Sequence, residues 1–447
     1  MNESPIFIHS LFRSGSTYLF KAFRRSDAGY WCYQEALHEA GIDGNDNPSN
    51  LFKDRGDDLV QQLRHPRIEV PYFQELYDTW PAWKDTLSAF SIYNGYFAPP
   101  DADIGIPYWK ALIDAAKGRP LFQECRTAGR LGAIKQQLGG YHIYLWRNPW
   151  DQWWSYKVAL YFDIVNQLII NAPNSPPAVD ALHSALGFQP YAQDDLVEAF
   201  AHYSAKPLTS EESYLVFYLL WCLGLEAGIK HAHLMLNIDH LSDSPVYQSE
   251  IQAQLTETGI GGIDFSDCKV PQGLYLEQDR AFFTVLEDKV HYWLKEGGWS
   301  QDELNQVQAL RQQYQPACWS KSIEASNPQD IAEQASRART LARRFETNVA
   351  AISREWTAKV GEAEVKARQA EEKARQAEEK ARQAEEKARQ AEEKAQQTEE
   401  KAQQAEEKAQ QAEEKARRAE ANLHAVYSSR SWRILAPLRK LASFFRR

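Results

Sequence analysis

Residues 6–23 read IFIHSLFRSGSTYLFKAF. The apolar run Ile6-Phe7-Ile8 is typical of a buried parallel strand. A turn of small residues follows, and from Tyr18 the apolar positions recur at helical spacing. A strand, a tight turn and a helix start leave backbone N–H groups and the positive end of a helix dipole facing one point. The stretch therefore predicts an anion-binding turn in an α/β fold.

The turn itself supplies several groups suited to an anion. Gly15 lets the backbone approach closely, Ser16 and Thr17 add hydroxyl donors, and Arg13 adds a charge. The turn is not a Walker A loop, because that pattern needs Lys where Ser16 stands. An ordinary strand–helix connection without a ligand is the alternative.

Composition limits the class of protein. The 447 residues are 43% hydrophobic and carry a formal charge of −10, which argues against a general nucleic-acid binder. Residues 1–361 carry −13, residues 362–420 carry −3 and residues 421–447 carry +6. An anion site in the first segment must therefore rely on local donors and a few placed cations.

The cysteines and apolar runs bear on location. Five widely spaced cysteines without a C-x-x-C pair suit a reducing compartment and give no zinc or disulfide pattern. The N-terminus lacks the pattern of a signal peptide, and no uninterrupted apolar run approaches the ~20 residues of a membrane span. We expect a cytoplasmic protein without a metal site.

Three segments differ in composition. We predict a globular domain over 1–325, a long helix with a seven-residue repeat over 326–421, and a basic tail over 422–447.

Within the globular part, residues 44–120 read as an insertion rich in loops, Trp and Tyr. A strand is predicted at 141–146 with a helix beginning near Asp151, then a helix at 213–230 and a strand at 233–238. Strands alternating with helices predict an α/β fold with a parallel sheet and ligands at the carboxyl ends of its strands.

A second anion site is predicted in YHIYLWRNPWDQWWSYK, residues 141–157. Arg147 stands at the carboxyl end of its strand and Ser155 lies in the following helix, so the two could clamp a phosphate. The alternative is a surface Arg that caps the strand end and a Ser that faces its own helix.

Together the two segments resemble the PAPS-dependent sulfotransferase family, which uses 3′-phosphoadenosine 5′-phosphosulfate. FRSGSTYL resembles the 5′-phosphosulfate loop of that family. YLWRNPWDQWWSYK is similar to its 3′-phosphate strand–loop–helix, with Arg and Ser eight positions apart. A weaker likeness is HLMLNIDHLSDSP, residues 233–245. The resemblance covers about residues 5–270.

The resemblance implies a P-loop-like sulfotransferase domain, of a bacterial type with a C-terminal coiled coil. PAPS would be the co-substrate, without a metal, and a hydroxyl of a saccharide or lipid-linked glycan would be the acceptor. The residues carried over for the 5′-phosphosulfate are Arg13, Ser14, Gly15, Ser16 and Thr17, and those for the 3′-phosphate are Arg147 and Ser155. Many soluble members have Lys where Arg13 stands, and Arg would act only by its charge.

The acceptor hydroxyl also needs a base, and the segment after residue 30 offers Glu35, His38 and Glu39. We favour Glu35, because relatives with Arg in the loop tend to place a Glu at about this distance. His38 has an unperturbed pKa near 6.5, better suited to the task. Alternatively, Glu35 and Glu39 form an ordinary solvated helix face.

Other residues have two readings each. The cations Arg126, Arg130 and Lys135 could neutralise the cofactor or an acidic acceptor, or pair with acids of the domain, which we favour. Aromatic side chains of the insertion could form a sugar-stacking cleft or a satellite core; they are Tyr72, Phe73, Trp80, Trp83, Tyr93, Tyr96, Phe97, Tyr108 and Trp109. Trp153 and Trp154 are expected to be packing residues.

From Lys366 the motif K-A-R-Q-A-E-E recurs every seven residues, with Gln replacing Arg in the middle copies. Its alanines form a narrow heptad stripe that buries little area, so a coiled coil and a free single helix both remain open. We favour a weak homodimer.

The tail from Ser429 to Arg447 alternates Leu and Phe with Arg and Lys, which suits peripheral contact with the inner face of a membrane or docking on the acidic domain. It also resembles the endings of bacterial enzymes that build surface polysaccharide.

Two other functions stay open at this point. A P-loop kinase acting on a small molecule would need ATP and magnesium. A non-enzymatic coiled-coil scaffold would carry a vestigial nucleotide-binding domain.

Overall fold

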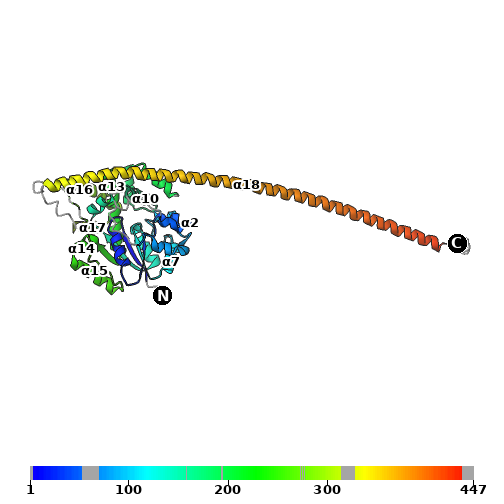
Figure 1. Cartoon of the computed structure of the whole chain (residues 1–447), viewed down its shortest axis with the longest axis horizontal. Coiled ribbons are helices and arrows are strands. Elements are labelled where there is room, and N and C mark those ends of the chain that lie inside the picture. Colours follow the sequence, from blue (N-terminus) through cyan, green and yellow to red (C-terminus); the bar gives the residue numbers. More distant parts are fainter. Residues whose placement is uncertain are drawn as a thin grey trace. The chain divides into compact units, whose positions relative to one another are not determined.

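The computed structural model describes residues 4–52, 70–157, 159–192, 195–271, 273, 275, 277–313 and 328–434. The chain divides into two compact units, Met1–Gly361 and Glu362–Arg447, and each is described by itself (Figure 1). The predicted domain boundaries at 325 and 421 stay a prediction.

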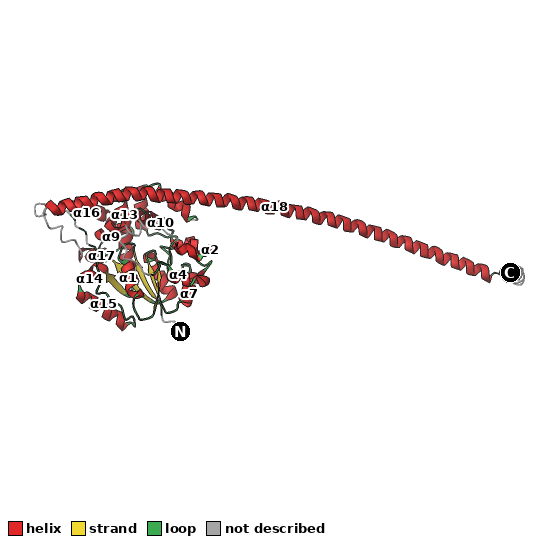
Figure 2. Ribbon diagram, in the orientation of Figure 1, coloured by secondary structure: helices red, strands yellow, loops and turns green. Residues whose placement is uncertain are grey.

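The first unit is built on one sheet of five parallel strands in the order β2-β3-β1-β4-β5. Figure 2 shows the sheet in yellow among the red helices of this unit. This confirms the α/β class and the parallel sheet. The strands are β1 (Ile6–Ser10), β2 (Tyr30–Gln34), β3 (Arg119–Glu124), β4 (Tyr141–Trp146) and β5 (Leu234–Asn237).

Two of these strands were not predicted. β3 reads RPLFQE, and its proline and polar ends hide the apolar pattern of a central strand. β2 reads YWCYQ and pairs with β3; its Tyr and Trp residues favour a strand, and the prediction missed that signal. The inserted segment is also less loop-rich than predicted, because it contains short helices and runs into β3 at Arg119.

Helices cover both faces of the sheet. On one face, Leu19 and Phe20 of α1 form a core with Ile6 and Ile8 of β1. On the other face, Phe7 of β1 joins the larger core with residues of α7, α8 and α13. The helices that the structure describes before residue 314 are α1 (Ser16–Arg24), α2 (Ala40–Asp46), η1 (Pro48–Phe52), α4 (Gln74–Asp78), α5 (Trp80–Trp83), α6 (Ala89–Ile92), α7 (Ile106–Ala115), η2 (Ala128–Arg130), α8 (Leu131–Leu138), α9 (Pro149–Tyr156), α10 (Tyr161–Ile170), α11 (Pro177–Leu186), α12 (Leu196–Ser204), α13 (Ser210–His231), α14 (Ile238–Asp243), α15 (Pro245–Glu257), α16 (Glu277–Glu296) and α17 (Gln301–Gln313).

Helix α13 confirms the predicted apolar helix. Thr209 and Glu212 form a capping box at its start. Among the described residues it is the one helix long and apolar enough to cross a membrane, and 83% of its most apolar stretch is buried inside the protein. A core helix passes the same test of length and composition.

The repeat lies within one continuous long helix, as predicted, and whether that helix pairs with a second copy stays a prediction. α18 runs from Pro328 to Ser428, seven residues beyond the predicted end, and α19 covers Arg430–Ile434. The rest of the predicted basic tail, residues 435–447, lies outside the described residues.

Candidate functional site

The loops after β1 and β4 open at the same edge of the sheet. The two strands are parallel neighbours, with Ser10 opposite Leu145 near their carboxyl ends. After β1 the chain continues to β2, which lies toward one end of the strand order. After β4 it continues to β5, which lies at the opposite end. The gap between β1 and β4 is therefore a topological switch point, where open α/β sheets bind ligands.

The first loop needs glycine at one position. Gly15 has φ of 91°, and a Cβ there would lie 2.7 Å from Cγ1 of Ile238. It is the N-cap of α1, and no described side chain caps that helix end or adds an acid to its first turn. The N-terminus of α1 thus presents its positive dipole end at this loop.

Ser14 adds a buried donor to this loop. Its side chain is 0% exposed, and its Oγ has no hydrogen-bond partner among the described residues. Burying a hydroxyl without a partner is unfavourable, so an acceptor atom at this loop would stabilise the folded protein.

A hydrogen bond joins the two predicted motifs. Nε of Arg13 donates to Oγ of Ser155 in α9 at 2.9 Å, although 142 positions separate them in the sequence. The pKa of Arg13 is lowered to about 10, mainly by burial and, as the second cause, by repulsion from Arg147. Arg13 therefore remains charged at neutral pH and has a second guanidinium nearby. The structure brings Arg13, Ser155 and Arg147 together at one edge of the sheet.

Arg147 is held by the third, weaker motif. Its Nε donates to Oδ1 of Asp239 at 3.3 Å, and its Nη2 donates to the carbonyl of Pro271. The N–H of Asn148 donates to the other oxygen of Asp239 at 2.7 Å. Burial raises the pKa of Asp239, while Arg147 acts in the opposite direction. The Arg147 side chain is thus oriented by a buried carboxylate, and it is not an exposed strand cap.

The first base candidate follows β2. Glu35 has φ of 41°, is 9% exposed, and donates its N–H to the carbonyl of Gln123 at 2.7 Å. The reading of Glu35 and Glu39 as a solvated helix face is therefore wrong. Glu35 comes directly after a strand, and both carboxylates turn inward to a buried cation.

That cation is Arg126, which is 0% exposed. Its Nη1 lies 2.7 Å from Oε2 of Glu35, and its Nη2 lies 3.0 Å from Oε2 of Glu39. Burial, the largest single influence, would raise the pKa of both carboxyls, but Arg126, His38 and the hydrogen bonds to the carboxylates together outweigh it, and both pKa values end below the usual range. The expectation that Arg126 pairs with acids is confirmed.

The other two cations of that group make different contacts. Nη1 of Arg130 donates to the carbonyl of Ser91 at 2.6 Å, and Nζ of Lys135 donates to the carbonyl of His231 at 2.8 Å. Both side chains therefore hold backbone segments of the domain.

Hydroxyl and imidazole groups complete the cluster. The Tyr72 hydroxyl donates to Oε1 of Glu35 at 2.5 Å, and Nδ1 of His38 lies 2.9 Å from Oε2 of Glu39. The guanidinium of Arg126 also stacks 4.9 Å above the ring of Phe12, which precedes Arg13. The base candidates are thus linked to the first loop through Arg126 and Phe12.

Sequence reasoning missed one titratable group here. Glu124 ends β3, is 1% exposed, and accepts the N–H of Leu37 at 3.0 Å through Oε1. Its Oε2 has no hydrogen-bond partner among the described residues, and burial raises its pKa to about 8. The available signal was a Glu at the end of a strand, but that strand itself was not predicted.

The aromatic residues of the insertion are core. Seven of the nine are buried within the larger core, and Tyr72 and Trp80 pack against it. They belong to the main core, so they form neither the sugar-stacking cleft nor the satellite core that the sequence suggested. Trp153 is buried as expected, whereas Trp154 is 40% exposed.

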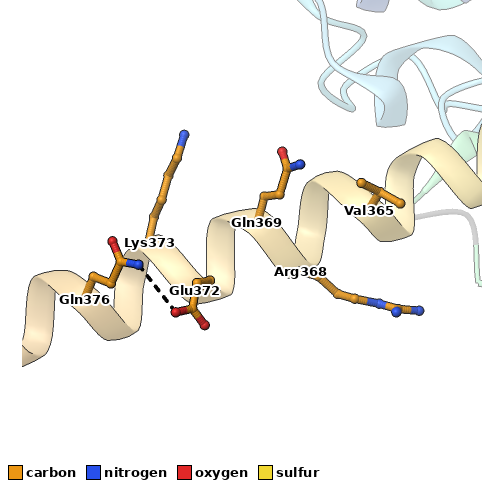
Figure 3. A pocket seen from close by; sticks show the side chains of 6 residues that line it. All are labelled: Val365, Arg368, Gln369, Glu372, Lys373 and Gln376. Carbon is orange, nitrogen blue, oxygen red and sulfur yellow. Dashed lines mark hydrogen bonds between the residues drawn. The ribbon is translucent and has the colours of Figure 1, made fainter.

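Other candidate sites are weak. The described residues contain no group of three His, Cys, Asp or Glu side chains that could hold a metal ion. An open hollow lies along α18, lined by Val365, Arg368, Gln369, Glu372, Lys373 and Gln376 (Figure 3). A single helix cannot enclose a ligand. The candidate site is therefore the edge of the sheet at the carboxyl ends of β1 and β4.

Comparison of the chain with protein-family models, curated proteins and solved structures finds no match.

Proposed function

We propose that the globular domain is a P-loop-like sulfotransferase, which moves a sulfuryl group from PAPS to a hydroxyl of a saccharide or lipid-linked glycan. The hydrogen bond from Arg13 to Ser155 carries the proposal, because it joins the two segments that resemble the donor-binding motifs of that family.

The residues present fit an anionic donor. Two neighbouring guanidiniums, Arg13 and Arg147, repel each other, and an anion between them would relieve that repulsion. The orphan hydroxyl of Ser14 and the uncapped start of α1 add donors. In this proposal Arg13, Ser14, Gly15, Ser16 and Thr17 hold the 5′-phosphosulfate, and Arg147 and Ser155 hold the 3′-phosphate.

Sulfuryl transfer resembles phosphoryl transfer, with a loose, in-line transition state in which the leaving oxygen gains negative charge. Arg13 and the N–H groups at the start of α1 would stabilise that charge. The hydrogen bond to Ser155 fixes the Arg13 side chain beforehand, so little reorganisation is needed when the charge develops.

Glu35 is our candidate for the group that receives the proton of the acceptor hydroxyl. Its pKa is lowered, so it is ionised at neutral pH, and Tyr72 already donates a hydroxyl hydrogen bond to its Oε1. A low pKa makes it a weak base, and its role would be mainly to orient the acceptor hydroxyl. His38, beside Glu39, is the alternative proton acceptor.

The test is transfer of labelled sulfate from PAPS to a panel of glycan and lipid-linked acceptors without added metal. Arg13→Ala should lower the rate by about 10²–10³-fold, because it removes a charge placed for the transition state. The matched control is Arg25→Ala, which removes an Arg that pairs with Asp267 on the surface of the domain; it should leave the rate nearly unchanged.

Binding of 3′,5′-adenosine bisphosphate separates the rival functions. Binding without sulfate transfer would favour the scaffold, and phosphate transfer from ATP with magnesium would favour the kinase. No binding to the wild-type chain would contradict the donor site.

We also propose that the enzyme is cytoplasmic and that its basic tail contacts the inner face of a membrane. Sedimentation of the full chain with vesicles rich in anionic lipid tests this, with neutral vesicles as the control. Equal sedimentation with both would contradict an electrostatic contact.

A further inference from the structure

Helix α18 carries its repeat without a break. Every described side chain from 365 to 428 is exposed. The heptad letters a to g are assigned here with Ala367 at a. Positions a and d are then Ala, except for Thr398 at one d position, and the flanking positions g and e are always Lys and Glu.

The lysines of position g form a row along the helix, and from Lys373 onward none of them has an acidic residue three or four positions away. From Lys373 to Lys415, the residues three and four positions away from each Lys are Ala, Gln, Thr or Arg. Those are the spacings at which side chains meet on a helix. Figure 3 shows Lys373 pointing away from Glu372, which accepts a hydrogen bond from Gln376 at 3.4 Å.

The arginines of position b behave differently. Arg389 pairs with Glu386 at 2.9 Å and Arg375 with Glu372 at 3.2 Å, both within the helix. In the three copies where Gln replaces this Arg, at 396, 403 and 410, the Lys and Glu rows continue unchanged. Within the helix, position b also reaches one member of the Glu row, since Nη2 of Arg417 lies 3.9 Å from Oε1 of Glu413, but the Lys row takes no part in these ion pairs of the described residues.

The two rows match a second copy in one orientation. In a parallel, in-register coiled coil, position g faces position e five residues later in the partner. Each of the eight lysines from Lys366 to Lys415 then faces a Glu, from Glu371 to Glu420. In an antiparallel pair, Lys would face Lys and Glu would face Glu.

We propose that residues 366–420 of two copies of this chain pair as a parallel, in-register coiled coil, with the orientation set by the Lys and Glu rows. The alanine stripe alone would not identify a partner; it lets two helices approach closely enough for the rows to meet. Alanine buries little apolar area, so the dimer is weak and depends on the charges. It therefore dissociates as salt screens them.

Oxidative cross-linking of the full chain tests the orientation. Ala374→Cys places a thiol at position a near one end of the repeat, beside its counterpart in a parallel dimer. In an antiparallel dimer pivoting on the middle of the repeat, the same thiol would lie about 57 Å away along the helix. Glu379→Cys, at the outward position f, is the matched control, and the native cysteines are the same in both variants.

The expected result is about tenfold more cross-linked dimer from Ala374→Cys than from Glu379→Cys, because a disulfide needs Cα atoms within about 7 Å. Equal cross-linking would overturn the parallel register. A wild-type chain that sediments as a monomer at tens of micromolar in low salt would overturn the dimer.

Charge exchange tests the rows themselves. One variant carries Lys380→Glu, Lys387→Glu, Lys394→Glu and Lys401→Glu; the other carries Glu385→Lys, Glu392→Lys, Glu399→Lys and Glu406→Lys. Each alone should be monomeric and their mixture dimeric, with circular dichroism checking that both keep their helix. Dimerisation of either variant alone, or a mixture that stays monomeric, would overturn the proposal.

Discussion

The buried guanidinium of Arg126 lies 2.7 Å from the carboxylate of Glu35, and this ion pair joins the end of β2 to the end of β3. Because Arg126 also contacts Glu39, its loss would leave two buried carboxylates without their cation. Removing one partner of a buried ion pair is much more unfavourable than removing an exposed pair.

We therefore expect Arg126→Met to lower the free energy of unfolding by about 3–5 kcal/mol, measured by urea denaturation at pH 7. The control is Arg25→Met, whose ion pair with Asp267 is exposed, and its change should stay within about 1 kcal/mol. Similar losses in both variants would contradict the buried cluster.

Glu124 predicts a dependence of stability on pH. Its pKa is raised by burial to about 8, so the folded protein keeps a proton that the unfolded chain releases near pH 4.5. The contribution of the Glu124 carboxyl to the free energy of unfolding is fully present below pH 4.5. It is lost as the pH rises to about 8, because the free energy of unfolding falls by about 1.4 kcal/mol per pH unit in this range.

Glu124→Gln keeps the shape and the acceptor for Leu37 but cannot ionise. Its stability relative to wild type should therefore rise between pH 5 and pH 8 and then level off. Urea unfolding of both proteins at each pH measures the difference; a difference that does not change with pH would mean that Glu124 ionises normally in the folded protein.

Gly15→Ala should disrupt the first loop. Its φ of 91° is unfavourable for Ala, and its new Cβ would meet Ile238 at 2.7 Å. We expect a loss of about 2–3 kcal/mol in the free energy of unfolding. Gly259→Ala isolates the effect of φ, because Gly259 has φ of 75° and no atoms within 4 Å of a new Cβ; it should lose only about 1 kcal/mol. Equal losses would show that Ile238 moves aside freely.

Ser155→Ala should weaken binding of 3′,5′-adenosine bisphosphate about tenfold, because it removes a hydroxyl from the proposed 3′-phosphate site together with the hydrogen bond that this hydroxyl accepts from Arg13. Ser184→Ala is the control, since that hydroxyl bonds only a carbonyl of its own helix among the described contacts. Isothermal calorimetry measures both, and unchanged binding in Ser155→Ala would place Ser155 outside the donor site.

The local sequence pattern was enough to predict the elements whose apolar residues, or alanines, are contiguous or recur at regular spacing. β1, β4 and α13 were predictable because their apolar residues are contiguous or regularly spaced, and α18 because alanine and charged residues recur every seven positions. β3 was missed because Pro120 and its polar ends interrupt the apolar pattern, whereas β2 was missed although its Tyr and Trp residues favour a strand.

The candidate site also combines features that the local sequence determined with features that only the tertiary structure decided. By itself the sequence determined which residues could bind an anion, since Arg13, Gly15 and the helix start after them are neighbours in the chain. Only the tertiary structure decided that Ser155 meets Arg13, that Asp239 holds Arg147, and that Glu35 is buried against Arg126. Those pairs are 142, 92 and 91 positions apart, so no local pattern encodes them. They form because parallel strand pairing brings the carboxyl ends of distant strands to one edge of the sheet.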